Sequence, residues 1–202
     1  MLRSSPSVLR AAIRALPSLT LGAWLVAATM TGGLTAPTPL RAQVAVAKDA
    51  PRAAATTVLL VRHAEKAAEP AADPPLTADG EARAQALVQV ARDAGVTAIV
   101  TTQFQRTRMT AAPLAQALGI TADVVTARGP DHPREVARTI LERHAGETVL
   151  VVGHSNTIPE IVAALGAPHP GVIADATHDN LFVVTVPADG KAKLVRARYG
   201  KP

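Results

Sequence analysis

The chain has 202 residues, of which 48% are hydrophobic, 18% are charged and only 2% are aromatic. This length suits one ordinary domain, and the apolar content excludes a disordered polar chain. So few aromatic side chains argue against a protein that stacks nucleic-acid bases, and we expect no nucleic-acid partner. Cysteine is absent, which excludes disulfides, thiolate catalysis, cysteine zinc sites and a lipoprotein anchor.

The formal net charge of +5 comes mostly from the N-terminus. The first 42 residues contain four arginines and no Asp or Glu, which leaves the rest of the chain close to neutral. The basic balance therefore does not indicate a surface for DNA or membranes.

The N-terminal segment has the features of an export signal. Arg3, Arg10 and Arg14 precede an apolar run of 16 residues from Leu19 to Leu34, and small residues and prolines follow. This order is typical of a signal peptide. The run is short for a stable membrane span, which needs about 20 residues, although a retained anchor is the alternative.

We therefore predict a signal peptide at residues 1–42, with cleavage near residue 42 or 47. Residues 43–55 are rich in Ala and have no periodicity, and we expect a flexible linker there. The folded domain is then expected at 56–202. The protein is predicted to be exported, either periplasmic or secreted, without stable membrane insertion after cleavage.

From residue 56 the chain alternates between strand-like and helix-like segments. Apolar β-branched runs indicate strands at 56–61, 96–101, 121–127 and 147–152. Helical spacing and capping residues, with Thr77 as an N-cap, indicate helices starting at 77, 105, 133 and 155. A Gly-containing turn at 188–190 predicts a terminal strand pair at 181–187 and 191–198. This order predicts an α/β fold: a three-layer α/β/α sandwich with a mostly parallel central sheet and helices on both faces.

Two predicted strands end directly in a histidine, and ligands bind beyond the carboxyl ends of strands in such sheets. The first strand runs into Arg62 and His63, and the fourth runs into His154. If these strands are neighbours, about 5 Å apart, both imidazoles can face one site. Arg106 follows the second strand, at the start of a helix that favours anions. Two arginines, two histidines and a helix N-terminus together predict a phosphate site.

Four short motifs follow one another at strand and helix ends: RHAEK at 62–66, LTADG at 76–80, RTRMTA at 106–111 and VGHSN at 152–156. Together they resemble the motifs of the histidine phosphatase superfamily, which includes the cofactor-dependent phosphoglycerate mutases. The resemblance extends over roughly residues 56–200. It implies a phosphatase that needs no cofactor and no metal, acting on a small phosphorylated substrate or a phosphoprotein.

The resemblance also implies roles for individual residues. His63 would be the nucleophile that takes the phosphoryl group, while Arg62, Arg106 and His154 would bind its oxygens. Lys66 aligns with a basic position that contacts phosphate in some members of the family.

The sequence gives no clear proton donor. Ser155 stands where the acid-phosphatase branch has Asp, and the segment after the third strand lacks the Glu of the mutase branch. Asp131 is our first candidate, because Gly129 and Pro130 allow a turn toward the site. Glu135 and Glu65 are the alternatives, and a member acting on easy leaving groups would need no dedicated donor.

The remaining histidines are predicted to have structural roles. His132, His144, His169 and His178 lack a supporting motif, and we expect surface positions or local hydrogen bonds. Asp175, His178 and Asp179 lack the spacing of a metal site, and we predict none. A mutase, or a binding module without catalysis, remains an alternative to a hydrolase. The export signal and the absence of long insertions argue against the mutase, and the intact set of site residues argues against the binding module.

Overall fold

The computed structural model describes residues 54–202, so the predicted signal peptide, its cleavage sites and most of the predicted linker lie outside the described residues. None of the helices in this range is long and apolar enough to cross a membrane. The elements are β1 (Thr56–Arg62), α1 (Ala78–Asp93), β2 (Ala98–Thr101), α2 (Gln105–Leu118), β3 (Asp123–Val124), α3 (His132–Arg143), β4 (Thr148–Gly153), α4 (Ile158–Ala164), β5 (Asn180–Val186) and β6 (Lys193–Arg198).

One six-stranded sheet runs through the domain in the order β3-β2-β4-β1-β5-β6. The pairings among β3, β2, β4 and β1 are parallel. The pairings of β5 with β1 and with β6 are antiparallel. This architecture confirms the predicted α/β fold, and it confirms that the strands carrying His63 and His154 are neighbours.

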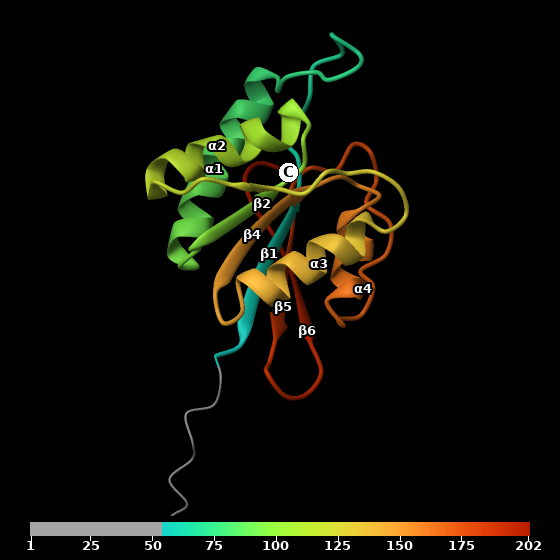
Figure 1. Ribbon diagram of the computed structural model, residues 1–202. Helices are drawn as coiled ribbons and strands as arrows, with labels where there is room; N and C mark the ends of the chain where they lie inside the picture. The colour runs from blue at the N-terminus through green and yellow to red at the C-terminus, as the bar shows by residue number, and fades with distance from the viewer. Residues whose placement is uncertain (1–53) are drawn as a thin grey trace, which may run out of the picture. The chain divides into compact units, whose positions relative to one another are not determined.

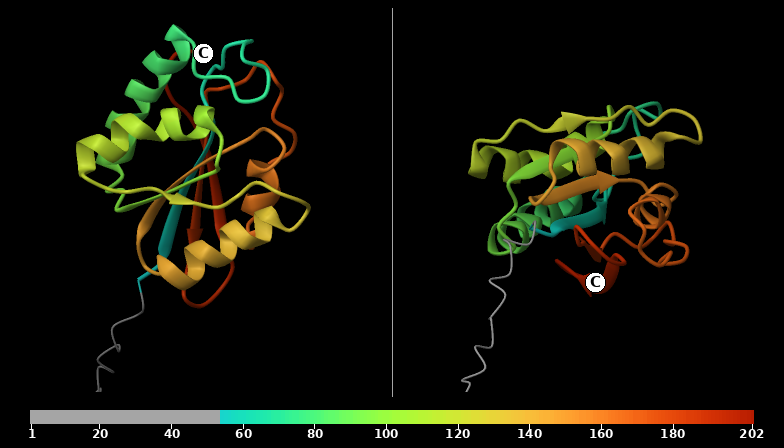
Figure 2. Two further views of the ribbon diagram at one scale, coloured as in Figure 1. Left: turned by 45° about the horizontal axis from the view of Figure 1, so that its top comes forward. Right: turned by 60° about the horizontal axis from the view of Figure 1, so that its bottom comes forward.

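Helices cover both faces of the sheet (Figures 1 and 2). Successive side chains of a strand point to opposite faces, so the apolar run of β1 contributes to two separate cores. Val58 and Leu60 pack with residues of α3 and α4. Leu59 and Val61 pack with residues of α1 and α2. The continuous Val and Leu content of β1 therefore reflects burial on both faces.

Two elements are much shorter than the sequence predicts. The strand expected at 121–127 is reduced to Asp123–Val124. The helix expected from 155 begins only at Ile158, because residues 154–157 form a turn in which the amide of Thr157 donates to the carbonyl of His154 at 3.1 Å. A side chain on Gly153 would place a Cβ 2.8 Å from Cδ1 of Ile158. Glycine at this position therefore leaves room for Ile158, whose side chain would have to shift to accept a larger residue.

Candidate active site

The carboxyl ends of β1 and β4 bring the two motif histidines together. Arg62 lies opposite Gly153 in the parallel register. The amide of His63 donates to the carbonyl of Gly153 at 2.9 Å, which continues the ladder one residue beyond the strand. The rings of His63 and His154 consequently lie 5.5 Å apart, edge to face.

The His63 imidazole is held in one orientation and one protonation state. Its Nδ1 lies 2.8 Å from the carbonyl oxygen of Ala64. A carbonyl only accepts, so Nδ1 carries the proton and the lone pair remains on Nε2. The residue is 4% exposed. Burial is the largest cause that lowers the pKa of His63, Arg62 and Arg106 act in the same direction, the Ala64 carbonyl opposes them, and the resulting pKa is about 4. At neutral pH the ring is therefore an uncharged nucleophile.

Thr110 on α2 links the His63 loop to the Arg106 motif. The amide of Ala64 donates to Oγ1 of Thr110 at 2.9 Å. The hydroxyl of Thr110 donates to the carbonyl of Arg106 at 2.7 Å. These bonds fix the loop carbonyl that orients His63 relative to the helix that carries Arg106.

Two largely buried arginines give the site its positive charge. Nη1 of Arg62 donates to the carbonyls of Ala174 and Asp175 at 3.0 and 2.7 Å. Arg106 lies over the Phe104 ring, 4.2 Å from its centroid, and 3.7 Å from the carboxylate of Asp73. The carboxylate nearest to Arg62 is that of Asp175, 3.7 Å away and 95% exposed. Nε of both arginines is buried without a hydrogen bond to the described residues, which leaves donors for an anion.

His154 completes the site from β4. Its Nε2 lies 3.1 Å from the hydroxyl of Thr102, which leaves Nδ1 as the nitrogen that can hydrogen-bond a bound anion. The Thr102 hydroxyl is itself 2.9 Å from that of Thr107. Burial, followed by the charges of Arg106 and His63, lowers the pKa of His154 to about 3.

Beside these groups is an open pocket of about 290 Å³. Its lining includes Phe104, Arg106, His132, His154 and Asn156. Within residues 54–202, no group of three or more His, Cys, Asp or Glu side chains is placed to hold a metal ion. The arrangement can bind a phosphoryl group through cationic donors and present a neutral imidazole to its phosphorus.

Comparison with known proteins agrees with this chemistry. Residues 58–128 match the model of the histidine phosphatase superfamily (branch 1), and this segment includes Arg62, His63 and Arg106. A solved structure from Nakamurella multipartitia, assigned as the phosphohistidine phosphatase SixA, is 29% identical to this chain. It covers 74% of this chain and 99% of its own, with a TM-score of 0.51. The chain is thus similar to the histidine phosphatase superfamily over the segment that carries these residues.

More distant structures share the fold of this chain. The protein histidine phosphatase SixA complexed with tungstate is 16% identical, with a TM-score of 0.56 over 70% of this chain and 96% of its own. A mycobacterial glucosyl-3-phosphoglycerate phosphatase is also 16% identical, with a TM-score of 0.55 over 73% of this chain and 100% of its own. No curated protein sequence matches the chain significantly.

The LTADG motif packs against the loop that follows His63 at residues 64–66. Thr77 caps α1, its hydroxyl accepting from the amide of Gly80 at 3.2 Å, and its own amide donates to the carbonyl of Glu65 at 2.9 Å. A Cβ on Gly80 would lie 2.2 Å from that same carbonyl oxygen. The motif therefore lets the start of α1 pack directly against the backbone two residues after His63.

Of the predicted residues, Arg62, His63, Arg106 and His154 come together, whereas Lys66 does not join them. Lys66 is exposed and pairs through its backbone with Leu76.

The predicted acids also lie outside the set of four. The side chain of Asp131 is 76% exposed and paired with Arg134, and Glu135 is exposed on α3. Neither carboxylate lines the pocket beside His154. This placement corrects our geometric argument for Asp131: residue 131 ends the loop as the residue before α3, with its side chain turned away from the pocket.

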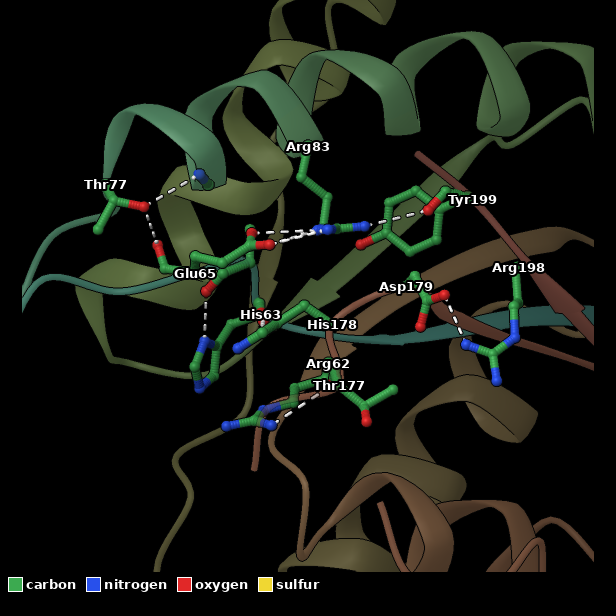
Figure 3. Close-up of polar contacts among 12 residues, drawn as sticks. Arg62, His63, Glu65, Thr77, Arg83, Thr177, His178, Asp179, Arg198 and Tyr199 are labelled. Carbon is green, nitrogen blue, oxygen red and sulfur yellow. Dashed lines mark hydrogen bonds and ion pairs between the residues drawn. The ribbon is translucent and has the colours of Figure 1, made fainter. Parts of the chain in front are cut away.

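Glu65 is occupied by an arginine that the sequence analysis did not consider (Figure 3). Nη2 and Nε of Arg83 on α1 donate to the Glu65 carboxylate at 2.8 and 3.0 Å, and Nη1 donates to the carbonyl of Tyr199 at 3.1 Å. Burial alone would raise the pKa of Glu65, but the bonds from Arg83 lower it. Glu65 is therefore an ionised, positioning residue rather than an acid.

Two histidines that the sequence analysis assigned to structural roles lie at the site. Nδ1 of His178 donates to the carbonyl of His63 at 2.9 Å, and the two rings lie 5.9 Å apart. His132 lines the pocket beside His154. Neither histidine belongs to a motif. Both reach the site because loops distant in the sequence fold back to the carboxyl edge of the sheet, which sequence patterns do not reveal.

Proposed function

We propose that this phosphatase is a metal-independent hydrolase of phosphomonoesters or phosphohistidine that acts through a phosphohistidine intermediate on His63. The observation that carries the proposal is the state of His63: a buried, neutral ring whose Nδ1 donates to Ala64, next to two arginines and a second histidine. A structural histidine would not need two cationic neighbours that lower its pKa.

The first chemical step forms a bond between Nε2 of His63 and phosphorus and breaks the bond from phosphorus to the leaving group. Arg62, Arg106 and His154 would hold the phosphoryl oxygens, where charge develops in a loose transition state. The Ala64 carbonyl stabilises the positive charge that the imidazole acquires. In the second step water attacks phosphorus, and the bond from Nε2 to phosphorus breaks to release phosphate.

A phosphohistidine carried by another protein is the substrate class that we favour. The pocket is open, so a phosphoryl group that protrudes from a larger molecule can enter it. The 29% identical neighbour is assigned as a phosphohistidine phosphatase. The leaving group in such a substrate is an imidazole, which departs more readily than an alkoxide.

The test compares three substrates with the domain starting near residue 48: p-nitrophenyl phosphate, a phosphohistidine peptide and 3-phosphoglycerate. We expect phosphate release from the first two, unchanged by a chelator, and no isomerisation of the third. Isomerisation without phosphate release would indicate a mutase. Phosphate binding without turnover of any substrate would indicate a binding module.

A further inference from the structure

His132 is the first residue of α3 and is 2% exposed, yet neither ring nitrogen forms a hydrogen bond to the described residues. Buried polar groups are almost always paired, and each exception calls for an explanation such as a missing ligand. The carbonyl of Thr126 is near enough to favour the protonated ring without meeting hydrogen-bond geometry. A histidine with only a structural role would leave two ring nitrogens buried without partners, which costs free energy of folding.

The ring is also in the right place to meet a substrate. His132 lines the same pocket as Arg106 and His154. Its charge would lower the pKa of His154, which places the two rings in one electrostatic environment. His132 thus lies in the wall of the pocket that Arg106 and His154 also line.

The pocket continues past His132 into a larger groove of about 530 Å³. Gly129, Asn156 and Thr157 line both hollows. The groove lies between the starts of α3 and α4 and is further lined by Pro130, Pro133, Arg134 and Glu160. A leaving group that extends from the phosphate site into this groove passes beside His132.

The carboxylates near the site are paired or exposed, and two of them lie beside the site arginines: Asp73 beside Arg106 and Asp175 beside Arg62. Glu65 is held by Arg83, and Asp131 is paired with Arg134 at the surface. Asp73 accepts from the amide of Gln105 at 2.9 Å. Asp175 is 95% exposed beside Arg62. None of these lines the pocket that holds Arg106 and His154.

We propose that His132 is the residue that protonates the leaving-group oxygen. As the bond from Nε2 of His63 to phosphorus forms and the bond to the leaving oxygen breaks, His132 gives its proton to that oxygen. The neutral His132 then takes a proton from the water that attacks the phosphohistidine, which restores both groups. The inference rests on the proposed function, since it assigns a role within that reaction.

The protonated form of His132 arises in the complex with substrate. In the free protein burial lowers the pKa of His132, with Thr126 and Glu135 opposing the effect. A phosphate dianion held by Arg106 and His154 adds negative charge beside the ring and favours its protonation.

The test measures kcat/KM of wild type and His132→Asn with an alkyl phosphate and a series of aryl phosphates of increasing leaving-group pKa. We expect His132→Asn to lose about 10²–10⁴ with the alkyl phosphate, and less than about tenfold with p-nitrophenyl phosphate, because a good leaving group needs no proton. The rate of the variant should therefore depend more steeply on leaving-group pKa. His144→Asn, at the opposite end of α3 and paired with Asp123 and Glu147, is the matched control and should leave every rate unchanged.

An equal loss on all substrates, or no loss, would overturn the assignment of His132. So would a loss confined to the alkyl phosphate in Asp131→Asn, Asp73→Asn or Asp175→Asn. Wild type without activity on any aryl phosphate would instead contradict the proposed function. If His132→Asn does not fold, nitrogen NMR of the wild-type ring gives the answer: saturating phosphate should protonate His132, and a ring that stays neutral contradicts the proposal.

Discussion

The two sides of the phosphate site are built differently. On one side His63 and His154 follow neighbouring parallel strands, and the strand register sets their separation. On the other side His132 is positioned by the loop after a two-residue strand and by the first turn of α3. The difference teaches that the sheet fixes the groups that hold the phosphoryl group, which every substrate shares. His132, which in the proposed reaction meets the leaving group, is held by a loop, and the leaving group is the part that varies between substrates.

The largest effect is expected on the strand side. His63→Ala should abolish turnover, because it removes the Nε2 lone pair that attacks phosphorus in the proposed reaction. Vanadate should still bind through the remaining cationic groups, with reduced affinity. Steady-state kinetics with p-nitrophenyl phosphate and a vanadate titration check both statements. Turnover of His63→Ala near the wild-type rate would contradict the division of roles.

Loss of one arginine of the site should be the next largest effect. Arg106→Ala should lower kcat by about 10²–10³, the cost typical of removing one donor that stabilises developing charge. The loss should be similar for aryl and alkyl phosphates, unlike the loss in His132→Asn. Arg108→Ala, an exposed arginine on the same helix, is the control and should change kcat little.

Loss of Arg83, which holds Glu65 two residues after His63, should lower mainly the stability of the fold. Arg83→Met removes the partners of the Glu65 carboxylate and of the Tyr199 carbonyl. Unpairing groups of this kind costs about 1–3 kcal/mol of the free energy of unfolding, which a denaturant titration measures. The rate should fall less than in Arg106→Ala. A loss of activity at unchanged stability would indicate that Arg83 acts on substrate directly.

Acid should destabilise the strand side through its two buried histidines. The unfolded chain binds protons near the ordinary histidine pKa of 6.5, whereas the folded pKa values are about 4 for His63 and about 3 for His154. The unfolded state therefore binds more protons below pH 6.5, and stability is lost as the pH falls from 6.5 toward 4. Thermal unfolding across this range checks the prediction. The slope should be shallower in His154→Asn, and an unchanged slope would contradict the assignment of the low pKa values.

The sequence predicts the strand side far better than the loop side. Apolar runs that end in Arg62 and His63 or in His154 reveal both the elements and the sheet edge where ligands bind, because parallel strands share one carboxyl edge. The role of Arg83 is hidden, since Glu65 lies in the loop before α1 and Arg83 lies on α1, so no single periodic element relates the two residues. The choice between Asp131 and His132 is hidden as well, because one residue at a helix start decides which side chain enters the pocket.

The most direct measurement is the site of phosphorylation during turnover. The enzyme is mixed with labelled p-nitrophenyl phosphate, quenched in alkali, where phosphohistidine is stable, and digested for mass spectrometry. The account predicts phosphate on His63, lost on brief acid treatment and absent from His63→Ala. Turnover with phosphate on another residue, or with none on the enzyme while hydrolysis of the intermediate is rate-limiting, would contradict it.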